Sequence, residues 1–262
     1  MKLAYDSRCT LAEGPVWDGR DLWFVDIASS HLFRSHTCWK LPCRASALAL
    51  RADDSLLLAT ENGLADFDPR TGDFRPRGPL EERAGNRSND AGVDPHGNFW
   101  VGTMDDAEEE ATGALWRIRP QDMTRMLSGI RIANTVVFSG EHLYFADSAA
   151  QIIWRFRVTP KGLQDREVFA TVNDAYPDGS ALDDEGFLWN AQWDGHRVVR
   201  YAPSGEVDRI VELPVKRPTS CAFSHDTLFV TSASIGDDHP WAGGVIALDV
   251  GIGGPAQPRT RL

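Results

Sequence analysis

The sequence predicts an all-β fold, a six-bladed β-propeller that residues 1–262 form as a single domain, and two observations support this prediction. Most of the candidate strands follow a polar turn such as DPHGN or DDEG. Six short apolar cores recur at spacings of 34–45 residues: LWFVD from Leu22, LLLAT from Leu56, FWVGT from Phe99, LYFAD from Leu143, LWNAQ from Leu188 and LFVTS from Leu228. Repeats of about 40–45 residues built from short strands are typical of propeller blades, which hold about four strands each.

The main alternative is a two-sheet sandwich, whose short strands recur every 8–12 residues or so. The longer period favours the propeller. Long helical periodicity is absent, which argues against βαβ units and a parallel sheet. The segment KLAYDSR precedes the first core, and we expect it to pair with the last strand, in GGVIALDV, so that no sheet edge stays open.

Composition and charge limit the possible partners. The chain has 27 Lys plus Arg against 38 Asp plus Glu, a net charge of −11 and no basic run, so nucleic acid is excluded as a partner. It has neither a signal peptide nor about 18 consecutive apolar residues, so we expect no membrane partner, a cytoplasmic location and, by default, a monomer. The four cysteines form no CxxC pair and are expected to be reduced.

Four repeats carry a carboxylate or an amide at one common position. Glu13 and Asn134 lie nine residues before their cores, and Asn89 and Asp178 lie ten before theirs. The first strand of each blade lines the central channel, so these side chains converge. Clustered carboxylates raise one another's pKa, and a divalent cation removes that cost. Hard oxygen donors suit Ca²⁺, Mg²⁺ or Mn²⁺, while Fe²⁺ and Zn²⁺ stay open.

Each of these residues alone is also compatible with turn chemistry. Glu13 could accept a hydrogen bond from a backbone amide, and Asn134 or Asp178 could stabilise a turn. Their shared place in the repeat favours the metal site. The equivalent positions in the second and sixth repeats fall near Ala47 and Thr219, which are small or weakly coordinating.

Two further segments are candidates for substrate contacts. Arg87 lies two residues before Asn89 and could bind a hydroxylated or anionic substrate, although a surface arginine is an equal alternative. The acidic run DDAEEE follows the third core, and Glu108 could reach a polar substrate, whereas such runs usually form solvated loops. The sequence has no GxSxG, HExxH or P-loop motif, so it does not favour a serine hydrolase, a zinc metalloprotease of the zincin class or a nucleotide-binding protein.

Five spaced segments resemble the gluconolactonase, regucalcin and luciferin-regenerating enzyme family over nearly the whole chain. They are LAEGPVWDGRDLWFVDI, NRSNDAGVDPHGNFWVGTM, IANTVVFSGEHLYFADS, YPDGSALDDEGFLWNAQWDG and RPTSCAFSHDTLFVTSAS. The resemblance implies a six-bladed propeller with one divalent metal ion in its central funnel. By matching motifs, it implies Glu13, Asn134 and Asp178 as the metal ligands and Arg87 and Asn89 as substrate-binding residues.

The sequence departs from the family pattern in two places. The family's S-N-G around the asparagine is A-N-T here, which keeps the ligand and changes the pocket wall. A sugar-binding glutamate of some relatives has no strict counterpart here. Its family spacing from the GTM motif, which is residues 102–104 in this sequence, leads to Ala107. Glu108, the next residue, is taken as the substrate-binding candidate.

The resemblance implies a metal-dependent lactonase that acts on a small sugar lactone. We expect hydrolysis of an aldonolactone to its aldonic acid, with gluconolactone and a pentonolactone such as xylonolactone or arabinolactone both open. Asp178 is expected to serve as ligand and as general base, and Ca²⁺ is the first choice of metal, with Zn²⁺, Mg²⁺, Mn²⁺ and Fe²⁺ as alternatives. A calcium-binding regulatory propeller without turnover and a metal-dependent ester or phosphotriester hydrolase are the competing functions.

Overall fold

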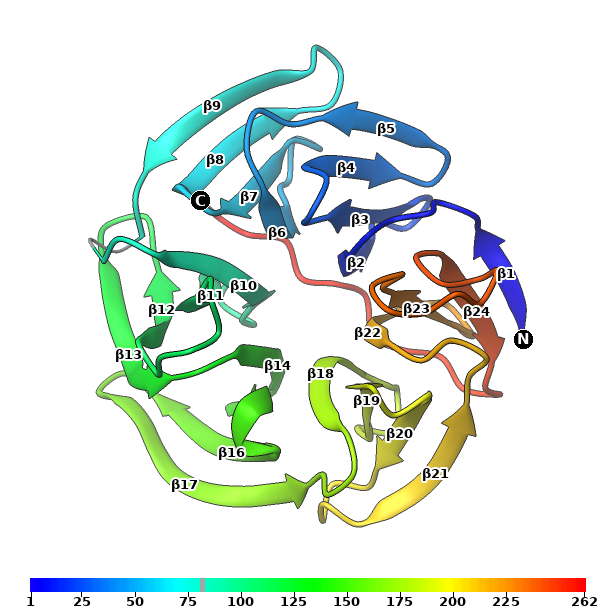
Figure 1. The fold of residues 1–262 in the computed structure, drawn as a ribbon. Helices are drawn as coiled ribbons and strands as arrows, with labels where there is room; N and C mark the ends of the chain where they lie inside the picture. Colours follow the sequence, from blue (N-terminus) through cyan, green and yellow to red (C-terminus); the bar gives the residue numbers. More distant parts are fainter. Residues whose placement is uncertain (81–82) are drawn as a thin grey trace.

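Six four-stranded antiparallel sheets surround a central channel in the computed structural model, which describes residues 1–80 and 83–262 (Figure 1). The predicted six-bladed propeller is confirmed. Blades 1 to 3 consist of β2 (Ala12–Trp17), β3 (Leu22–Asp26), β4 (His31–Arg34) and β5 (Thr37–Lys40); β6 (Ala45–Leu50), β7 (Leu56–Thr60), β8 (Gly63–Asp68) and β9 (Asp73–Gly78); and β10 (Asn86–Val93), β11 (Phe99–Asp105), β12 (Gly113–Ile118) and β13 (Met123–Ile130).

Blades 4 to 6 follow the same order from the channel outward. They consist of β14 (Ala133–Ser139), β15 (His142–Asp147), β16 (Ile152–Thr159) and β17 (Gly162–Thr171); β18 (Tyr176–Leu182), β19 (Leu188–Trp193), β20 (Arg197–Tyr201) and β21 (Val207–Glu212); and β22 (Pro218–Ser224), β23 (Thr227–Ser232), β24 (Val245–Asp249) and β1 (Lys2–Tyr5). A short 3₁₀ helix, η1 (Ser148–Ala150), follows β15. No helix among the described residues has the length and apolarity needed to cross a membrane.

The six apolar cores are the second strands of the blades. Each is packed between two neighbouring blades, so both of its faces are buried and its sequence is apolar throughout instead of alternating. Between blades 3 and 4, for example, Trp100 and Leu115 share a buried cluster with Leu143, Phe145 and Trp154. The hydrophobic core is therefore divided into clusters that lie between adjacent sheets.

The first and last strands close the ring in one sheet. β1 pairs with β24 through Lys2 with Ala247 and Leu3 with Ile246, so the N-terminal strand is the outer strand of blade 6. The closure predicted for KLAYDSR is confirmed. This pairing covers an edge of β24 that would otherwise expose unpaired backbone groups.

Blades 1, 3 and 5 share a side-chain arrangement that we call the Asp–Trp–Arg stack. An aspartate in the turn after the first strand accepts the indole Nε1–H of a second-strand tryptophan at 2.8, 2.9 and 2.9 Å, and a third-strand arginine lies over the same ring. The members are Asp18, Trp23 and Arg34; Asp94, Trp100 and Arg117; and Asp183, Trp189 and Arg200.

Residues 251–262, the tail, cross one end of the channel and are drawn in red in Figure 1. Backbone hydrogen bonds tie the tail to blades 2 and 3, from Thr260 to Leu50 at 2.8 Å and from Arg261 to Gly97 at 2.9 Å. Its Gly253 carbonyl accepts the amide of Asp184 in blade 5 at 2.9 Å. The tail and the inner strands of all six blades line a cavity of about 120 Å³, so this end of the channel is covered.

Candidate active site

All six site residues predicted from the sequence line one cavity at the other end of the channel. The cavity, here called the funnel, has a volume of about 130 Å³. Its lining residues come from the inner strands of blades 1, 3, 4 and 5, from the ends of the second strands β11 and β19, and from nearby loops: Leu11, Glu13, Arg87, Asn89, Met104, Glu108, Ile132, Asn134, Ser148, Asp178 and Trp193. Glu108 is exposed at its rim, whereas the other five predicted residues are buried.

A β-bulge lies beside every predicted residue of the inner strands. The register between first and second strands shifts after Glu13, after Ser88, after Asn134 and after Pro177. A bulge re-aims the neighbouring side chains, and here it turns polar side chains toward the channel axis. Strands β6 and β22 also have a bulge, so the equivalent positions of blades 2 and 6 are Ser46 and Thr219.

Two aspartates at the ends of second strands fix the chain just before the predicted metal ligands. Asp26 accepts the amide of Leu11 at 3.0 Å, two residues before Glu13. Asp147 accepts the amide of Ile132 at 3.0 Å, two residues before Asn134. The recurrence of aspartate at the end of LWFVD and LYFAD is a sequence signal that could have identified this interaction.

Hydroxyl groups connect the site across neighbouring blades. Ser46 donates to the Asn89 carbonyl at 2.7 Å, and Thr219 donates to the carbonyl of Ala12. Thr135 donates to the Asp178 carbonyl, so blade 4 holds the backbone of blade 5 at a predicted ligand. None of these hydroxyl contacts was predicted from the sequence, because each joins residues that are far apart along the chain.

The two asparagines are oriented by one hydrogen-bond chain. Arg87 Nη1 donates to Asn89 Oδ1 at 2.7 Å, and Asn89 Nδ2 donates to Asn134 Oδ1 at 3.2 Å. Asn134 Nδ2 in turn donates to Ser148 Oγ at 2.8 Å. This chain fixes the orientation of the Asn134 amide, whose oxygen accepts one hydrogen bond and keeps a second lone pair for a ligand.

The buried carboxylates of the funnel have no protein cation close enough to form an ion pair among the described residues. Glu13 and Asp178 are 9% and 6% exposed. Burial, followed by the charge of Asp90, raises the pKa of Glu13 to about 8. Burial, then Glu13 and then Asp90, raise the pKa of Asp178. Two carboxylates and one amide from three blades are the hard oxygen donors that a divalent cation requires, so the residues present fit such an ion.

Asp90 is a third carboxylate near the channel axis that sequence inspection missed; it is half-buried and lines the cavity at the covered end of the channel. Burial raises its pKa to about 6, although its oxygens accept the amides of Ala91 at 2.8 Å and Val136 at 3.0 Å. It follows Asn89 directly, and its negative charge acts on both Glu13 and Asp178. Asp90 therefore increases the local negative potential in which a cation would be bound.

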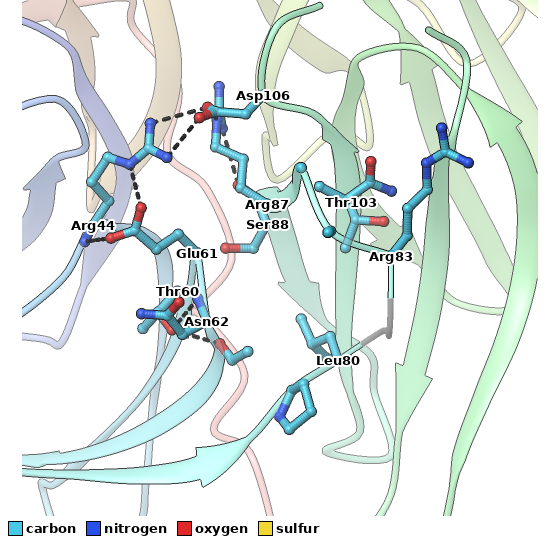
Figure 2. A pocket seen from close by; sticks show the side chains of 15 residues that line it. Arg44, Thr60, Glu61, Asn62, Leu80, Arg83, Arg87, Ser88, Thr103 and Asp106 are labelled. Carbon is cyan, nitrogen blue, oxygen red and sulfur yellow. Dashed lines mark hydrogen bonds and ion pairs between the residues drawn. The ribbon is translucent and has the colours of Figure 1, made fainter.

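Arg87 is held by an ion-pair chain that Figure 2 shows. Arg87 Nε donates to Asp106 at 2.8 Å, and Asp106 accepts two further bonds from Arg44 at 3.0 and 2.8 Å. Arg44 Nε also donates to Glu61 at 2.7 Å. These residues, together with Arg87, line a second cavity of about 410 Å³ between blades 2 and 3, so Arg87 lies between this cavity and the funnel.

Fold and site together define a class of protein, a closed six-bladed propeller with one polar funnel on its axis. The chain belongs to the SMP-30/gluconolactonase/LRE-like family, whose model matches residues 11–234. The family identified from the five sequence segments is thereby confirmed.

Relatives with related names cover almost the whole chain. L-arabinolactonase of Azospirillum brasilense is 37% identical over 98% of this chain and 94% of that protein. The 6-deoxy-6-sulfogluconolactonase of Pseudomonas putida is 30% identical over 98% and 97%. A crystal structure of the calcium-binding protein regucalcin from Agrobacterium tumefaciens superposes with a TM-score of 0.91 at 30% identity, covering 99% of this chain and 97% of that one. The predicted enzyme class, a gluconolactonase-like carboxylic ester hydrolase, is confirmed at the level of the family.

Proposed function

We propose that this protein hydrolyses a sugar aldonolactone to its aldonic acid in the funnel, with one divalent cation held by Glu13, Asn134 and Asp178. The observation that carries the proposal is the meeting of two buried carboxylates and an amide in one cavity without a paired protein cation. The lactonase names of two relatives support the reaction class.

The donor set and one structural relative support Ca²⁺ as the first choice of metal. Carboxylate and amide oxygens suit Ca²⁺, Mg²⁺ and Mn²⁺, and Zn²⁺ or Fe²⁺ remain alternatives. The regucalcin relative is described as calcium-binding. When bound, the cation would supply Lewis acidity toward the lactone carbonyl and electrostatic stabilisation of the developing negative charge.

Asp178 is assigned the general-base role. A water oxygen forms a bond to the carbonyl carbon while an Asp178 carboxylate oxygen accepts the water proton. The ester bond between the carbonyl carbon and the ring oxygen then breaks, and the ring oxygen takes the proton from Asp178 to become a hydroxyl group, which restores the carboxylate. The product is the open-chain acid, and no organic cofactor is consumed.

Arg87, Asn89 and Glu108 are assigned to binding and orienting the sugar. Arg87 and Asn89 already share a hydrogen bond, so both side chains are held in place before a substrate arrives. Side chains held in place lower the entropic part of the barrier by holding the ester in one orientation. Met104 and Ile132 supply apolar wall that limits access of bulk water.

The small funnel supports a single sugar ring as substrate. The arabinolactonase relative favours a pentonolactone, and the sulfogluconolactonase relative favours a hexonolactone. We therefore propose testing L-arabinolactone, D-xylonolactone, gluconolactone and galactonolactone side by side by proton release. Turnover is expected with at least one lactone, to disappear on treatment with EDTA and to return on addition of a divalent cation.

The same assay separates the competing functions. Tight Ca²⁺ binding without proton release from any lactone would overturn the lactonase assignment in favour of a regulatory calcium-binding propeller. Turnover of an aryl ester or a phosphotriester, but of no lactone, would assign a different hydrolysis to the same funnel.

Asp178→Asn is predicted to lower kcat/KM for the best lactone by about 10²–10⁴-fold, the usual contribution of a positioned general base. The matched control is Asp226→Asn, because Asp226 is exposed in the β22–β23 turn, at the end of blade 6 opposite the funnel. The control should keep the activity of the unchanged protein. Near-normal turnover by folded Asp178→Asn would refute the role of Asp178.

A further inference from the structure

The arginine of the Asp–Trp–Arg stack is fully neutralised in blade 5. Arg200 forms ion pairs with Asp183 at 2.7 Å, Glu185 at 2.5 Å and Asp208 at 2.8 Å. The Arg200 side chain is only 6% exposed, so these three carboxylates compensate for the loss of its hydration.

Blade 1 provides the same compensation with fewer partners. Arg34 pairs with Asp21 at 2.9 Å and lies 3.7 Å from Asp18. Its side chain is 36% exposed, so solvent also screens its charge.

Blade 3 lacks both additional carboxylates of blade 5. His96 occupies the place of Glu185, because each lies two residues after the aspartate of its stack. Asp208 lies at a β-bulge of β21, where the register against β20 shifts after Arg200. Strand β13 pairs Thr124 with Arg117 and has no register shift there, so no residue of blade 3 corresponds to Asp208.

The remaining carboxylate of the blade 3 stack does not contact its arginine. Asp94 accepts the backbone amides of His96 and Asn98, the Asn98 side chain and the Trp100 indole. In blade 5, by contrast, the equivalent Asp183 accepts a bond from Arg200 Nε at 2.8 Å. The hydrogen-bonding capacity of Asp94 is thus used within its own turn and by Trp100.

Arg117 is consequently a buried cation that forms no ion pair with the described residues, and the charges of Asp122 and Asp94 act on it only from a greater distance. It is 8% exposed, and its Nε atom has no hydrogen-bond partner. Its one recorded close interaction is with the face of Trp100, at 5.6 Å from the ring centroid. Burial, followed by the charge of Arg119, lowers the pKa of Arg117. An unpaired buried charge is costly, and proteins normally supply it with a partner.

A cavity of about 410 Å³ lies beside Arg117, between blades 3 and 4. Arg119 and His96 also line it, and its other wall comes from the β14–β15 and β16–β17 turns of blade 4. Asp122 binds Arg119 at the surface, and the exposed Glu141 lines the cavity without forming an ion pair with Arg117. The turn that contains His96 follows the end of β10 that is opposite Arg87 and Asn89, so this cavity is separate from the funnel.

We propose that this cavity binds a small oxyanion, a phosphate or a carboxylate group, which takes the place of the two carboxylates that blade 5 supplies from its own chain. Arg117 is the principal cation, because it is buried and unpaired, and Arg119 and His96 complete the polar wall. The site is independent of the lactonase reaction, and its occupancy stabilises the contact between blades 3 and 4.

The test compares phosphate binding by the unchanged protein with binding by two variants, one that lacks the Arg117 cation and one that gives this cation a carboxylate partner. Calorimetric titration with inorganic phosphate, and melting in phosphate against chloride at equal ionic strength, should show saturable binding and a higher Tm for the unchanged protein. His96→Glu installs the carboxylate of blade 5, so it should raise the Tm in chloride and weaken phosphate binding at least tenfold. Arg117→Met should also weaken binding at least tenfold, whereas Arg125→Met should not, because Arg125 is an exposed arginine of the same blade.

The outcomes distinguish the site from general salt effects. The proposal would be overturned if phosphate bound with the same affinity, and raised the Tm by the same amount, in the unchanged protein, His96→Glu and Arg117→Met. It would also be overturned if the unchanged protein bound neither phosphate nor a simple carboxylate. Acetate, which has no sugar part, serves as the second probe, and the tighter of acetate and phosphate shows whether the oxyanion is a carboxylate or a phosphate. If Arg117→Met does not fold, His96→Glu still decides, because it adds a partner for Arg117 and keeps the stack intact. Lactone turnover by His96→Glu should equal that of the unchanged protein, so failure of the lactonase assignment leaves this test unaffected.

Discussion

Thr135 shows how one residue can connect backbone strain to the candidate site. Its φ is +53°, a left-handed conformation that a β-branched residue rarely adopts, and it is fully buried. Such strain persists only where the surroundings compensate for it. Here the hydroxyl donates to the Asp178 carbonyl and also lies 2.9 Å from Ser180 Oγ. The threonine in A-N-T therefore gains a contact between blades that glycine, the residue usual in the family motif, cannot make.

Thr135→Val is predicted to lower the free energy of unfolding by about 1–3 kcal/mol, because it leaves buried polar groups with fewer partners. Thr135→Ser keeps the hydroxyl and should lose less than half as much. Urea denaturation followed by tryptophan fluorescence measures both values. A valine variant as stable as the unchanged protein would show that the hydroxyl contributes nothing to the contact.

Asp106→Asn is predicted to raise KM for the best lactone about tenfold with a smaller effect on kcat. Asp106 bonds both Arg87 and Arg44, so the neutral amide would loosen the guanidinium that is assigned to the substrate. Glu109→Gln in the same exposed loop is the control, since its side chain forms no recorded bond. A fall in kcat at constant KM would contradict a positioning role for Asp106.

At the scale of the elements, the inner strands of blades 1 and 4 combine a bulge with an anchored entry. The bulge turns the side chain toward the axis, and the aspartate after the second strand holds the segment that leads into the inner strand. Asn134 thus depends on Asp147, which lies in a different strand and does not line the funnel. The same construction in blade 1 uses Asp26 to fix the approach to Glu13.

Asp147→Ala is predicted to lower the free energy of unfolding by about 1–3 kcal/mol, because it frees the amides of Arg131 and Ile132. It should also weaken divalent-cation binding, measured by calorimetry, since Asn134 would be less well held. Asp73→Ala removes an exposed ion pair with Arg75 and should change stability by less than about 0.5 kcal/mol. Unchanged stability and cation affinity in Asp147→Ala would refute the anchoring role.

The elements that repeat in sequence could be predicted, and the contacts that join different blades could not. Counting back from the apolar cores found Glu13, Asn134 and Asp178, because a repeated strand order places equivalent residues at equivalent heights. The contribution of Thr135 depends on a register shift and on a carbonyl of the next blade, which no local pattern encodes. The role of the tail was missed for the same reason, since its bonds reach blades 2, 3, 5 and 6.

At the scale of the whole molecule, the tail acts as a brace across the covered end of the channel. It is bonded to blades 2, 3 and 5, and its Gly254 amide donates to the His225 carbonyl beside blade 6 at 3.2 Å. Thr260 is buried there, and its hydroxyl donates to the Gly97 carbonyl at 3.0 Å. The tail therefore links blades that are not neighbours in the ring.

Deletion of residues 251–262 is predicted to lower Tm by roughly 4–8 °C, which corresponds to a loss of about 2 kcal/mol in a chain of this size. Arg261→Ala keeps the backbone bonds of the tail and should melt within about 1 °C of the unchanged protein. Differential scanning calorimetry compares the three proteins. An unchanged Tm for the deletion would show that the tail contributes no bracing.

The pairing of β1 with β24 also affects how the protein is made. Lys2 leaves the ribosome well before its partner Ala247, because the two residues lie far apart along the chain. At about 5–20 residues per second, the N-terminal strand waits roughly 12–50 s before its partner exists. Five complete sheets can form during translation, but the ring can be sealed only after β24 has been synthesised. Until then the nascent protein exposes an unpaired strand that chaperones or neighbouring polypeptides can bind.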